Sequence, residues 1–446
     1  MAHRIVIVGG GFGGVYAAKR LCKHKELDIT LIDRRNFHLF QPLLYQVATG
    51  GLSPGDITFP IRGIFKKFSH FKTINGNVLD IDPIRKRVVL NDLQVPFDSL
   101  IVSTGAKYHY FGNPVWEDIA PGLKSIENAI FYRGKILKAF EQAEIEPDPV
   151  QRKKLLTFVI IGGGPTGVEM AGAVAELARQ TLRHDFRNIN PDESRILLLE
   201  GAHKVLPTYQ EKLQDKAIHS LKRLGVEMIH HALATGIDDK GVDIKNNATN
   251  ETLRVESGNI FWAAGVKATN LGPVIAERLG ATTDRTGRIQ VNPDCTVPGH
   301  PDIFVIGDMA HFRDKGGNPL PGVATVAMQQ GDYCANVIIR RQHHKPIRDF
   351  RYRDKGSLAV IGRNAAVADI ANMKFSGYPA WIIWVFVHLY YLIGFENRLL
   401  VFIQWAIFYF TRHRGARLIT SDDTKNEWFE KEITEYAKQN QKVGVL

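Results

Sequence analysis

Cysteine is scarce in this chain, whose 446 residues include only Cys22, Cys295 and Cys334. The three lie far apart in the sequence, and none belongs to a C-x-x-C motif. This spacing excludes a disulfide framework and a thiol redox centre of the disulfide-reductase type. We therefore expect the protein to work in a reducing compartment.

Signals for targeting, nucleic-acid binding and metal binding are also missing. The first apolar run starts by Ile5, which leaves no room for a signal or transit peptide, so we expect the folded domains to face the compartment of synthesis. The formal net charge of +11, from 57 basic and 46 acidic residues, favours acidic partners. Without an RNA-reading motif, a helix-turn-helix or a zinc-ligand spacing, we expect neither nucleic acid nor a metal.

Glycine, by contrast, is concentrated in two fingerprints of the form G-x-G-x-x-G. Gly9, Gly11 and Gly14 follow an apolar run at residues 5–8, and Gly162, Gly164 and Gly167 follow another at residues 158–161, 153 residues later. Such loops open a helix whose backbone amides bind a pyrophosphate. The length favours two to three domains. Two fingerprints predict two dinucleotides held face to face, with electron transfer between them.

An acidic residue follows the first fingerprint at the usual distance. Residues 28–33 are typical of a second strand, and Asp33, at its end, lies 19 residues past Gly14. At an offset of about 20 residues a carboxylate meets the ribose hydroxyls. A further strand breaks at Thr104 and Gly105, which is either an ordinary strand end or a turn close to the cofactor.

In the second half the matching acid is farther away. Glu200 ends the strand-like run 195–200 and lies 33 residues past Gly167; we assign the surplus to a longer crossover helix and return loop in residues 177–194. A carboxylate here favours NADH over NADPH, although His203 and Lys204 keep NADPH as an alternative. Glu169, in the first turn after the fingerprint, is either an acid favoured at a helix N-terminus or a carboxylate beside the nicotinamide.

A third strand, at residues 302–306, runs into Gly307 and Asp308, where an acid can accept ribitol or ribose hydroxyls. At this point the sequence resembles the two-dinucleotide flavoprotein oxidoreductases, and within them type II NADH dehydrogenase, from Arg4 to Thr420. The resemblance is carried by residues 33–48, 162–173, 306–308, 394–398 and 414–419.

The resemblance implies an α/β fold with two Rossmann-like, glutathione-reductase-like domains and a C-terminal membrane-associating helical segment. The implied division is 1–120 and 286–345 for FAD, 121–285 for NADH, and 346–446 for the anchor. It implies a hydride passed from NADH to FAD and two electrons passed on to a membrane quinone, without proton pumping. The implied FAD ligands are Gly9, Gly11, Gly14, Asp33, Thr104 and Asp308. The implied NADH ligands are Gly162, Gly164, Gly167 and Glu200, with Glu169 beside the nicotinamide.

One position departs from the family pattern. Relatives often have A-Q-x-A-x-Q on the quinone-facing side of the flavin, whereas residues 324–330 have Thr325 in place of the first glutamine. Gln329 matches the second, and is either a quinone-side contact or part of a helix packed on the sheet.

The C-terminal part favours a membrane surface. Residues 375–395 carry no charge, but Gly377 and Pro379 predict a helix only from Ala380, about 24 Å long and too short to span a bilayer. A second uncharged run covers residues 399–411, and residues 340–355 hold seven basic side chains. The aromatic positions expected on one interfacial face are Trp381, Trp384, His388 and Tyr391.

These features predict a monotopic anchor in anionic lipid, on the cytoplasmic face of the cell inner membrane. A homodimer interface and a true membrane span are the alternatives for the same helices, and we expect a homodimer in any case. The last stretch, residues 421–446, is polar and predicts a surface helix or a frayed end.

Three other functions share this fold. A sulfide:quinone oxidoreductase needs a cysteine pair beside the flavin, and Cys334 has no evident mate near residues 162–170. A soluble ferredoxin or rubredoxin reductase does not require the apolar C-terminal segment. A non-catalytic redox sensor or scaffold would not require both fingerprints and both ribose acids, which this chain keeps.

Overall fold

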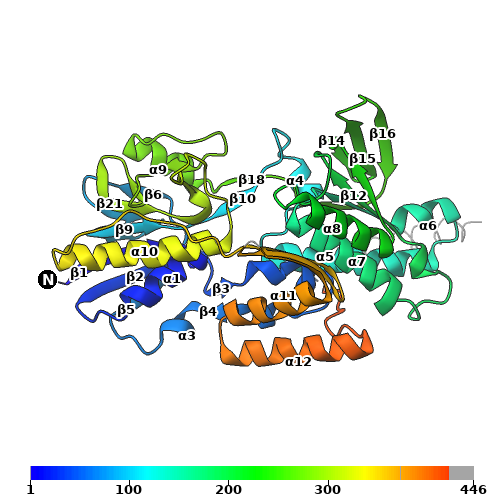
Figure 1. The fold of residues 1–446 in the computed structure, drawn as a ribbon, viewed down its shortest axis with the longest axis horizontal. Coiled ribbons are helices and arrows are strands. Elements are labelled where there is room, and N and C mark those ends of the chain that lie inside the picture. The colour runs from blue at the N-terminus through cyan, green and yellow to red at the C-terminus, as the bar shows by residue number, and fades with distance from the viewer. Residues whose placement is uncertain (1, 372, 421–446) are drawn as a thin grey trace, which may run out of the picture.

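The computed structural model describes residues 2–371 and 373–420, arranged as two α/β lobes with two apolar helices along one side (Figure 1). Residues 421–446, for which the sequence predicts a surface helix or a frayed end, lie outside the described residues. The two lobes and the helical C-terminal segment confirm the predicted fold class.

The first lobe is built on a six-stranded sheet with the order β20-β21-β9-β1-β2-β5. These are β20 (Thr296–Val297), β21 (His300–Val305), β9 (Ser99–Val102), β1 (His3–Val8), β2 (Leu27–Asp33) and β5 (Phe71–Asn75). All pairs are parallel except β20–β21. Since β21 follows the second lobe in the sequence, the chain leaves the first sheet, builds the second lobe and then returns to the first sheet.

Helices α1 (Phe12–Leu21) and α10 (Ala324–Gln342) pack on each other beside this sheet. They touch at glycines, since a Cβ at Gly331 would clash with the carbonyl oxygen of Gly13. Helix α1 starts directly after the first fingerprint, so this packing fixes the loop against the returning part of the chain.

The second lobe repeats the core of the first. Its parallel sheet has the order β13-β12-β11-β17, which matches β5-β2-β1-β9 position by position. The strands are β11 (Thr157–Ile161), β12 (Arg195–Glu200), β13 (Val226–His230) and β17 (Asn259–Trp262). Helices α5 (Ile126–Ile145), α7 (Pro165–Glu176) and α8 (Glu211–Arg223) belong to this lobe, with an antiparallel sheet of β14 (Ala232–Asp238), β15 (Gly241–Asn246) and β16 (Thr252–Glu256). The two halves are therefore structural relatives.

The extra residues before Glu200 form a longer crossover. Helix α7 continues as one π-helical turn, Leu177–Thr181, and a loop follows. The carboxylate of Glu144 accepts backbone N–H groups of Arg187, Asn188 and Ile189 and so holds this loop.

A two-stranded antiparallel ribbon joins the lobes (Figure 1). Strand β10 (Ala106–Tyr108) pairs with β18 (Val266–Ala268), and the hydroxyl groups of Thr104 and Thr269 lie 2.7 Å apart at its base. Both strands follow a strand-to-glycine exit, at Gly105 and Gly265, so the ribbon starts from equivalent places in the two lobes.

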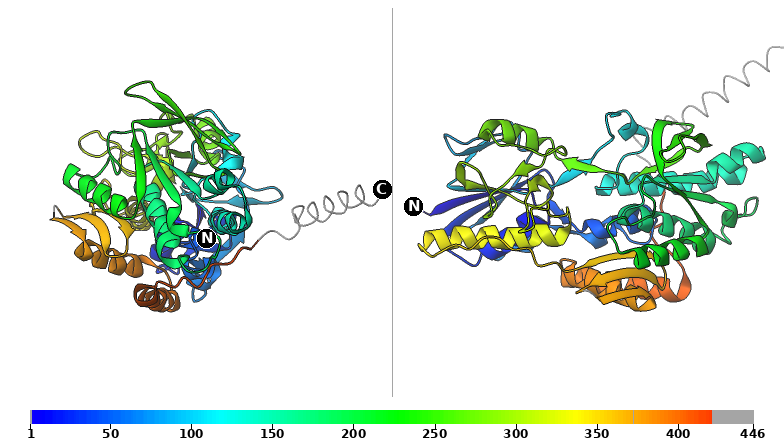
Figure 2. Two further views of the ribbon diagram at one scale, coloured as in Figure 1. Left: turned by 90° about the vertical axis from the view of Figure 1, so that its right-hand side faces the viewer. Right: turned by 45° about the horizontal axis from the view of Figure 1, so that its top comes forward.

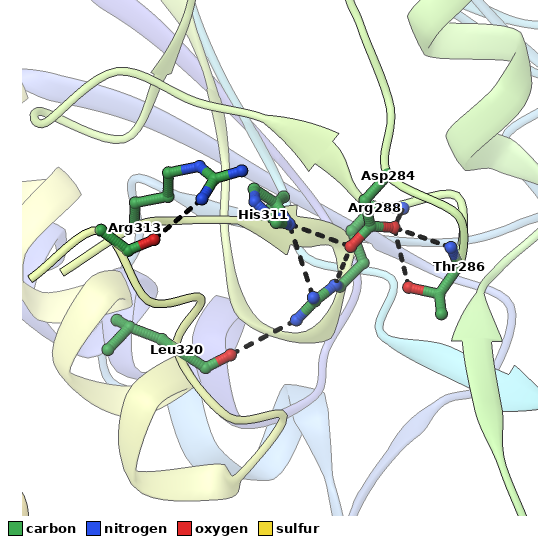
Figure 3. Close-up of polar contacts among 7 residues, drawn as sticks. Asp284, Thr286, Arg288, His311, Arg313 and Leu320 are labelled. Carbon is green, nitrogen blue, oxygen red and sulfur yellow. Dashed lines mark hydrogen bonds and ion pairs between the residues drawn. The ribbon is translucent and has the colours of Figure 1, made fainter.

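A half-buried polar cluster secures the return to the first lobe (Figure 3). The Asp284 carboxylate accepts hydrogen bonds from Thr286 and Arg288 and lies 2.9 Å from His311 Nδ1. Burial alone would raise the pKa of Asp284, but these hydrogen bonds outweigh it and hold the pKa well below its usual range. The cluster ties residues 284–288 to β22 (Ala310–His311), close to Asp308.

The C-terminal segment forms a small sheet and two helices. Strands β23 (Ser357–Gly362), β24 (Ala365–Ile370) and β25 (Met373–Gly377) pack on α7 and α8, and a Cβ at Gly172 would clash with the carbonyl oxygen of Ile361. Helices α11 (Tyr378–Tyr391) and α12 (Phe395–Thr411) follow and lie together on one side of the molecule (Figure 2).

Both helices differ from the sequence prediction at their starts. The first begins at Tyr378 rather than Ala380, because Pro379 sits in the first turn, where a missing N–H breaks no hydrogen bond. The second begins at Phe395 and includes Glu396 in its first turn, where an acid is favourable. No helix in the described part of the chain is long and apolar enough to cross a membrane.

The prediction of a lipid-facing aromatic face is wrong for two of its four residues. Trp384 is 2% exposed and His388 is 9% exposed, and the His388 ring packs on Phe40 of the first lobe. Trp384 also packs on Trp405 of α12. The large apolar side chains exposed on these two helices are Tyr378, Phe386, Tyr390, Phe395, Leu399, Leu400, Phe402, Ile403, Ile407 and Phe410.

Candidate active site

The first fingerprint forms an open backbone cradle at the end of β1. Gly9 has φ +105°, and a Cβ on it would lie 2.5 Å from the carbonyl oxygen of Ser103. A Cβ at Gly14 would clash with the carbonyl oxygen of Gly9, whereas one at Gly11 would meet nothing. Gly9 and Gly14 therefore accept no side chain, because the loop folds on itself there. The space beside Gly11 leaves the helix N-terminus open to a pyrophosphate.

Asp33 completes this cradle. Its Oδ2 atom accepts the Gly10 N–H at 2.5 Å and its Oδ1 accepts the Arg35 N–H at 2.7 Å. The carboxylate is thereby held beside the glycine loop, as a ribose-binding acid must be.

The second fingerprint has the same construction. Gly162 has φ +109°, and a Cβ at Gly167 would clash with the carbonyl oxygen of Gly162. Glu200 Oε2 accepts the Gly163 N–H at 2.7 Å, and Oε1 accepts the Ala202 N–H at 2.7 Å. The long offset in the sequence does not displace the acid, because the extra residues form the crossover.

The sheet order gathers the remaining first-lobe residues on one edge. Thr104 follows β9, which pairs in parallel with β1, and Asp308 follows β21, which pairs in parallel with β9, so both residues lie along the carboxyl edge of the sheet with the glycine loop. Asp308 forms an ion pair with Lys124 at 3.6 Å. Sequence reasoning missed Lys124, since an isolated lysine carries no motif.

Glu169 lines a pocket that reaches from α7 to the apolar helices. The pocket walls come from α2 (Leu44–Ala48), α7, β23, α11 and α12. Burial raises the pKa of Glu169 to about 8, and a hydrogen bond with the Val360 backbone opposes this only in part. Glu169 is therefore a carboxyl group that keeps its proton near neutral pH, as catalytic acids often do.

Aromatic and amide side chains line the pocket next to Glu169. The Trp405 indole N–H donates to Gln46 Oε1 at 2.7 Å, and Gln46 Nε2 donates to the Tyr45 hydroxyl at 2.9 Å. Burial raises the pKa of Tyr45 well above its ordinary value, and Glu169 adds to this once it is ionised at high pH. This hydrogen-bonded chain connects α12 to α2.

A buried ion pair forms another part of the pocket wall. Glu176 Oε2 lies 3.6 Å from an Arg414 guanidinium nitrogen, and Glu176 Oε1 accepts the Arg363 N–H at 2.5 Å. Arg414 also donates to the Thr49 carbonyl oxygen at 3.0 Å. Sequence reasoning named Arg414 only as part of the family resemblance and did not single out Glu176, because its partner lies more than 200 residues away.

The structure does not bring Gln329 into this pocket. Its amide group pairs with the Arg353 backbone, at 2.9 Å to the carbonyl oxygen and 3.0 Å to the N–H. Thr325, which replaces the family glutamine, lies 3.0 Å from the Tyr352 hydroxyl. Both side chains belong to α10 and hold residues 352–353 against that helix. A quinone contact for Gln329 stays a prediction.

The cysteines lie away from the pocket. Cys334 lies close enough to Cys295 for it to raise the pKa of that thiol, but both are buried in the core of the first lobe with Cys22, and neither is near residues 162–170 in the sequence. None of the three lines the pocket that contains Glu169.

Comparison with known proteins agrees with this geometry. Residues 3–331 match the pyridine nucleotide-disulphide oxidoreductase family, and residues 355–413 match the NDH2 C-terminal domain. The chain is 45% identical to the type II NADH:quinone oxidoreductase Ndh of Mycobacterium tuberculosis, over 94% of this chain and 90% of the relative. It is 30% identical to the type II NADH:quinone oxidoreductase of Staphylococcus haemolyticus, over 84% and 92%.

Solved structures show the same fold. The Plasmodium falciparum NDH2 in complex with NADH superposes with a TM-score of 0.87 at 22% identity, covering 94% of this chain and all of that one. The sulfide:quinone oxidoreductase of Aquifex aeolicus gives a TM-score of 0.71 at 18% identity, covering 92% and 95%. With two nucleotide cradles and a family match over nearly its whole length, the chain belongs to the type II NADH:quinone oxidoreductases, flavoenzymes that use FAD to pass electrons from NADH to a quinone.

Proposed function

We propose that FAD lies on the first-lobe cradle and NADH on the second, with Glu169 as the acid that serves the acceptor. The FAD ligands are Gly9, Gly11, Gly14, Asp33, Thr104 and Asp308. The NADH ligands are Gly162, Gly164, Gly167 and Glu200. The corresponding domains are 1–120 with 286–345, and 121–285. Two cradles built alike, each with a carboxylate on the second amide of its glycine loop, support this assignment.

FAD, when bound, supplies the redox chemistry by taking a hydride from NADH and returning two electrons to a quinone. Converting a quinone to a quinol with the hydride of NADH takes up one further proton. The protein must hold that proton close to the acceptor and align the partners. Glu169 suits the task, because its pKa of about 8 keeps it protonated at neutral pH.

The pocket beside Glu169 is the proposed approach of the acceptor. It is walled by Trp381, Trp405 and Phe408 of the two apolar helices, so an apolar quinone can enter from the side that carries them. This position does not conflict with the sequence prediction that Glu169 lies beside the nicotinamide, since both partners must come close to one flavin ring.

We further propose that residues 346–446 anchor the protein on anionic lipid, with α11 and α12 lying flat in one leaflet. Phe386, Tyr390, Phe395 and Phe410 are each more than 60% exposed, which is unfavourable in water and favourable in a bilayer interface. The basic residues at 340–355 supply charge for lipid headgroups. The proposed side is the cytoplasmic face of the inner membrane, which suits three free cysteines, and a homodimer remains part of the proposal.

Glu169→Gln tests the role of this acid. Rapid mixing separates flavin reduction by NADH from flavin oxidation by a short-chain quinone. We expect the variant to be reduced at the normal rate and oxidised by quinone at least about tenfold more slowly, the effect of removing a general acid. Slower reduction with normal oxidation would instead place Glu169 at the nicotinamide alone.

A further inference from the structure

We propose that this protein rejects NADPH with three carboxylates rather than one. Glu200 repels the 2′-phosphate directly, while Glu211 and Asp215 of α8 occupy the lysine that would otherwise attract it. The inference rests on the proposed position of the adenosine ribose at Glu200.

Lys204 is the residue that could let the site bind NADPH as well as NADH. It lies four residues after Glu200, in the loop between β12 and α8, which is where dinucleotide-binding proteins place a basic residue to accept a 2′-phosphate. His203 and His231 lie beside it in this region, with their ring nitrogens 3.3 Å apart. In the sequence, Lys204 and His203 are the side chains that keep NADPH as an alternative to NADH.

Two acids remove Lys204 from this role. Its ammonium group donates to Glu211 Oε1 at 2.9 Å and to Asp215 Oδ1 at 2.7 Å. The acids are four residues apart on α8, so they lie on the same side of the helix. The Lys204 side chain is only 20% exposed, compared with 78% for Glu211 and 57% for Asp215. The ammonium group of Lys204 is therefore already paired with two carboxylates rather than free to bind a ligand.

The charge balance has the same consequence. Three carboxylates against one ammonium group give this corner of the site a net negative charge, and a phosphate monoester carries nearly two negative charges at neutral pH. NADH has only hydroxyl groups at this position, which the Glu200 carboxylate can accept. Among the described residues, neither Glu211 nor Asp215 forms a hydrogen bond or ion pair with Glu200 or the glycine loop, so we expect NADH binding not to depend on them.

The test compares three variants: Glu200→Gln, the pair Glu211→Gln/Asp215→Asn, and all three substitutions together. We expect Glu200→Gln to raise kcat/KM for NADPH about tenfold and the triple variant to raise it about tenfold further, each step being one lost or gained charge contact. The pair alone leaves kcat/KM for NADH within about twofold. Adding Lys204→Ala to the triple variant should abolish the second gain.

A second readout does not depend on turnover. Binding of 2′,5′-ADP, measured by calorimetry on the holoenzyme, should strengthen in the triple variant and weaken again when Lys204 is removed. The control is Glu227→Gln/Glu256→Gln, which also neutralises two acids of the second lobe paired with basic residues, Arg195 and Lys154. These pairs lie at the opposite, amino-terminal edge of the sheet.

The outcomes separate the two claims. If the triple variant uses NADPH no better than Glu200→Gln does, or if the control pair gives the same gain, the role of Glu211 and Asp215 is overturned while the ribose position stands. If Glu200→Gln changes neither the KM for NADH nor the preference between the two nucleotides, the ribose is not at Glu200 and both claims fall.

Discussion

Glu169 holds its proton more tightly than an exposed glutamate, because burial raises its pKa to about 8. As the pH rises through 8, the carboxyl group ionises and can no longer donate a proton to the acceptor. We expect the quinone-dependent step to slow above pH 8 and this slowing to be absent in Glu169→Gln. The rate of flavin oxidation by quinone, followed from pH 6 to 9.5, provides the comparison.

The same shift predicts how stability depends on pH. The carboxyl group has a higher pKa in the folded protein than the ordinary value of about 4.3 in the unfolded chain. Its contribution is therefore fully present below pH 4 and is lost as the pH rises through 8. The melting temperature of Glu169→Gln should equal that of the wild type at pH 4 and exceed it by about 2 °C at pH 9. Equal melting temperatures at pH 9 would show that the group ionises freely.

Gly14 and Gly167 occupy equivalent positions in the two cradles, and a Cβ at either one would clash with the carbonyl oxygen of the first glycine. We expect Gly14→Ala to be purified largely without flavin. Gly167→Ala should keep its flavin and its yellow colour but be reduced by NADH at least about tenfold more slowly, since distorting the loop removes pyrophosphate contacts. Visible absorbance before and after addition of NADH distinguishes the two variants. Flavin loss in Gly167→Ala and slow flavin reduction in Gly14→Ala would reverse the assignment of the lobes.

The segment after α12 is fixed to α7 of the second lobe by the Glu176–Arg414 ion pair, whose side chains are 8% and 5% exposed, and to Thr49 by a hydrogen bond from Arg414. Removing one partner of a buried pair leaves an uncompensated charge and costs about 3 kcal/mol or more. Arg414→Met should therefore lower the melting temperature, and Arg414→Met/Glu176→Gln should recover part of the loss. A single variant as stable as wild type would show that the pair is not needed.

Helices α11 and α12 divide their aromatic residues between two surroundings. Trp384 and His388 pack inward, whereas Phe386, Tyr390 and Phe410 are exposed. Replacing these three with serine should reduce flotation with anionic vesicles at least about tenfold, because each buried aromatic contributes a kcal/mol or more to interfacial binding. Activity with a water-soluble quinone should remain. Leu253→Ser, on exposed strand β16, is the control. Unchanged flotation would favour a protein interface for these helices.

These elements also show what a sequence can and cannot predict. Each glycine loop, the strand before it and the acid after it form a local pattern, so the two cradles could be predicted from it. The inward face of α11 could not, because helical periodicity places Trp384 and His388 on one side without saying what covers it. The pairings of Lys204 with Glu211 and Asp215, and of Glu176 with Arg414, depend on where a loop or the chain end folds back.

The whole molecule repeats one nucleotide-binding core and joins the copies through β10 and β18. The first copy is completed by the returning strand β21, and the pocket of Glu169 lies between the second copy and the apolar helices. On the proposed assignment, this arrangement gives the donor and the acceptor separate approaches to a single flavin, one from the second lobe and one from the helices.

Anaerobic rapid mixing of the purified holoenzyme tests this electron path most directly. We predict that NADH bleaches the visible band of the flavin in full and that one equivalent of a short-chain quinone then restores it, with quinol formed in equal amount. A flavin that NADH leaves oxidised, or a reduced flavin that no quinone reoxidises, would contradict the account.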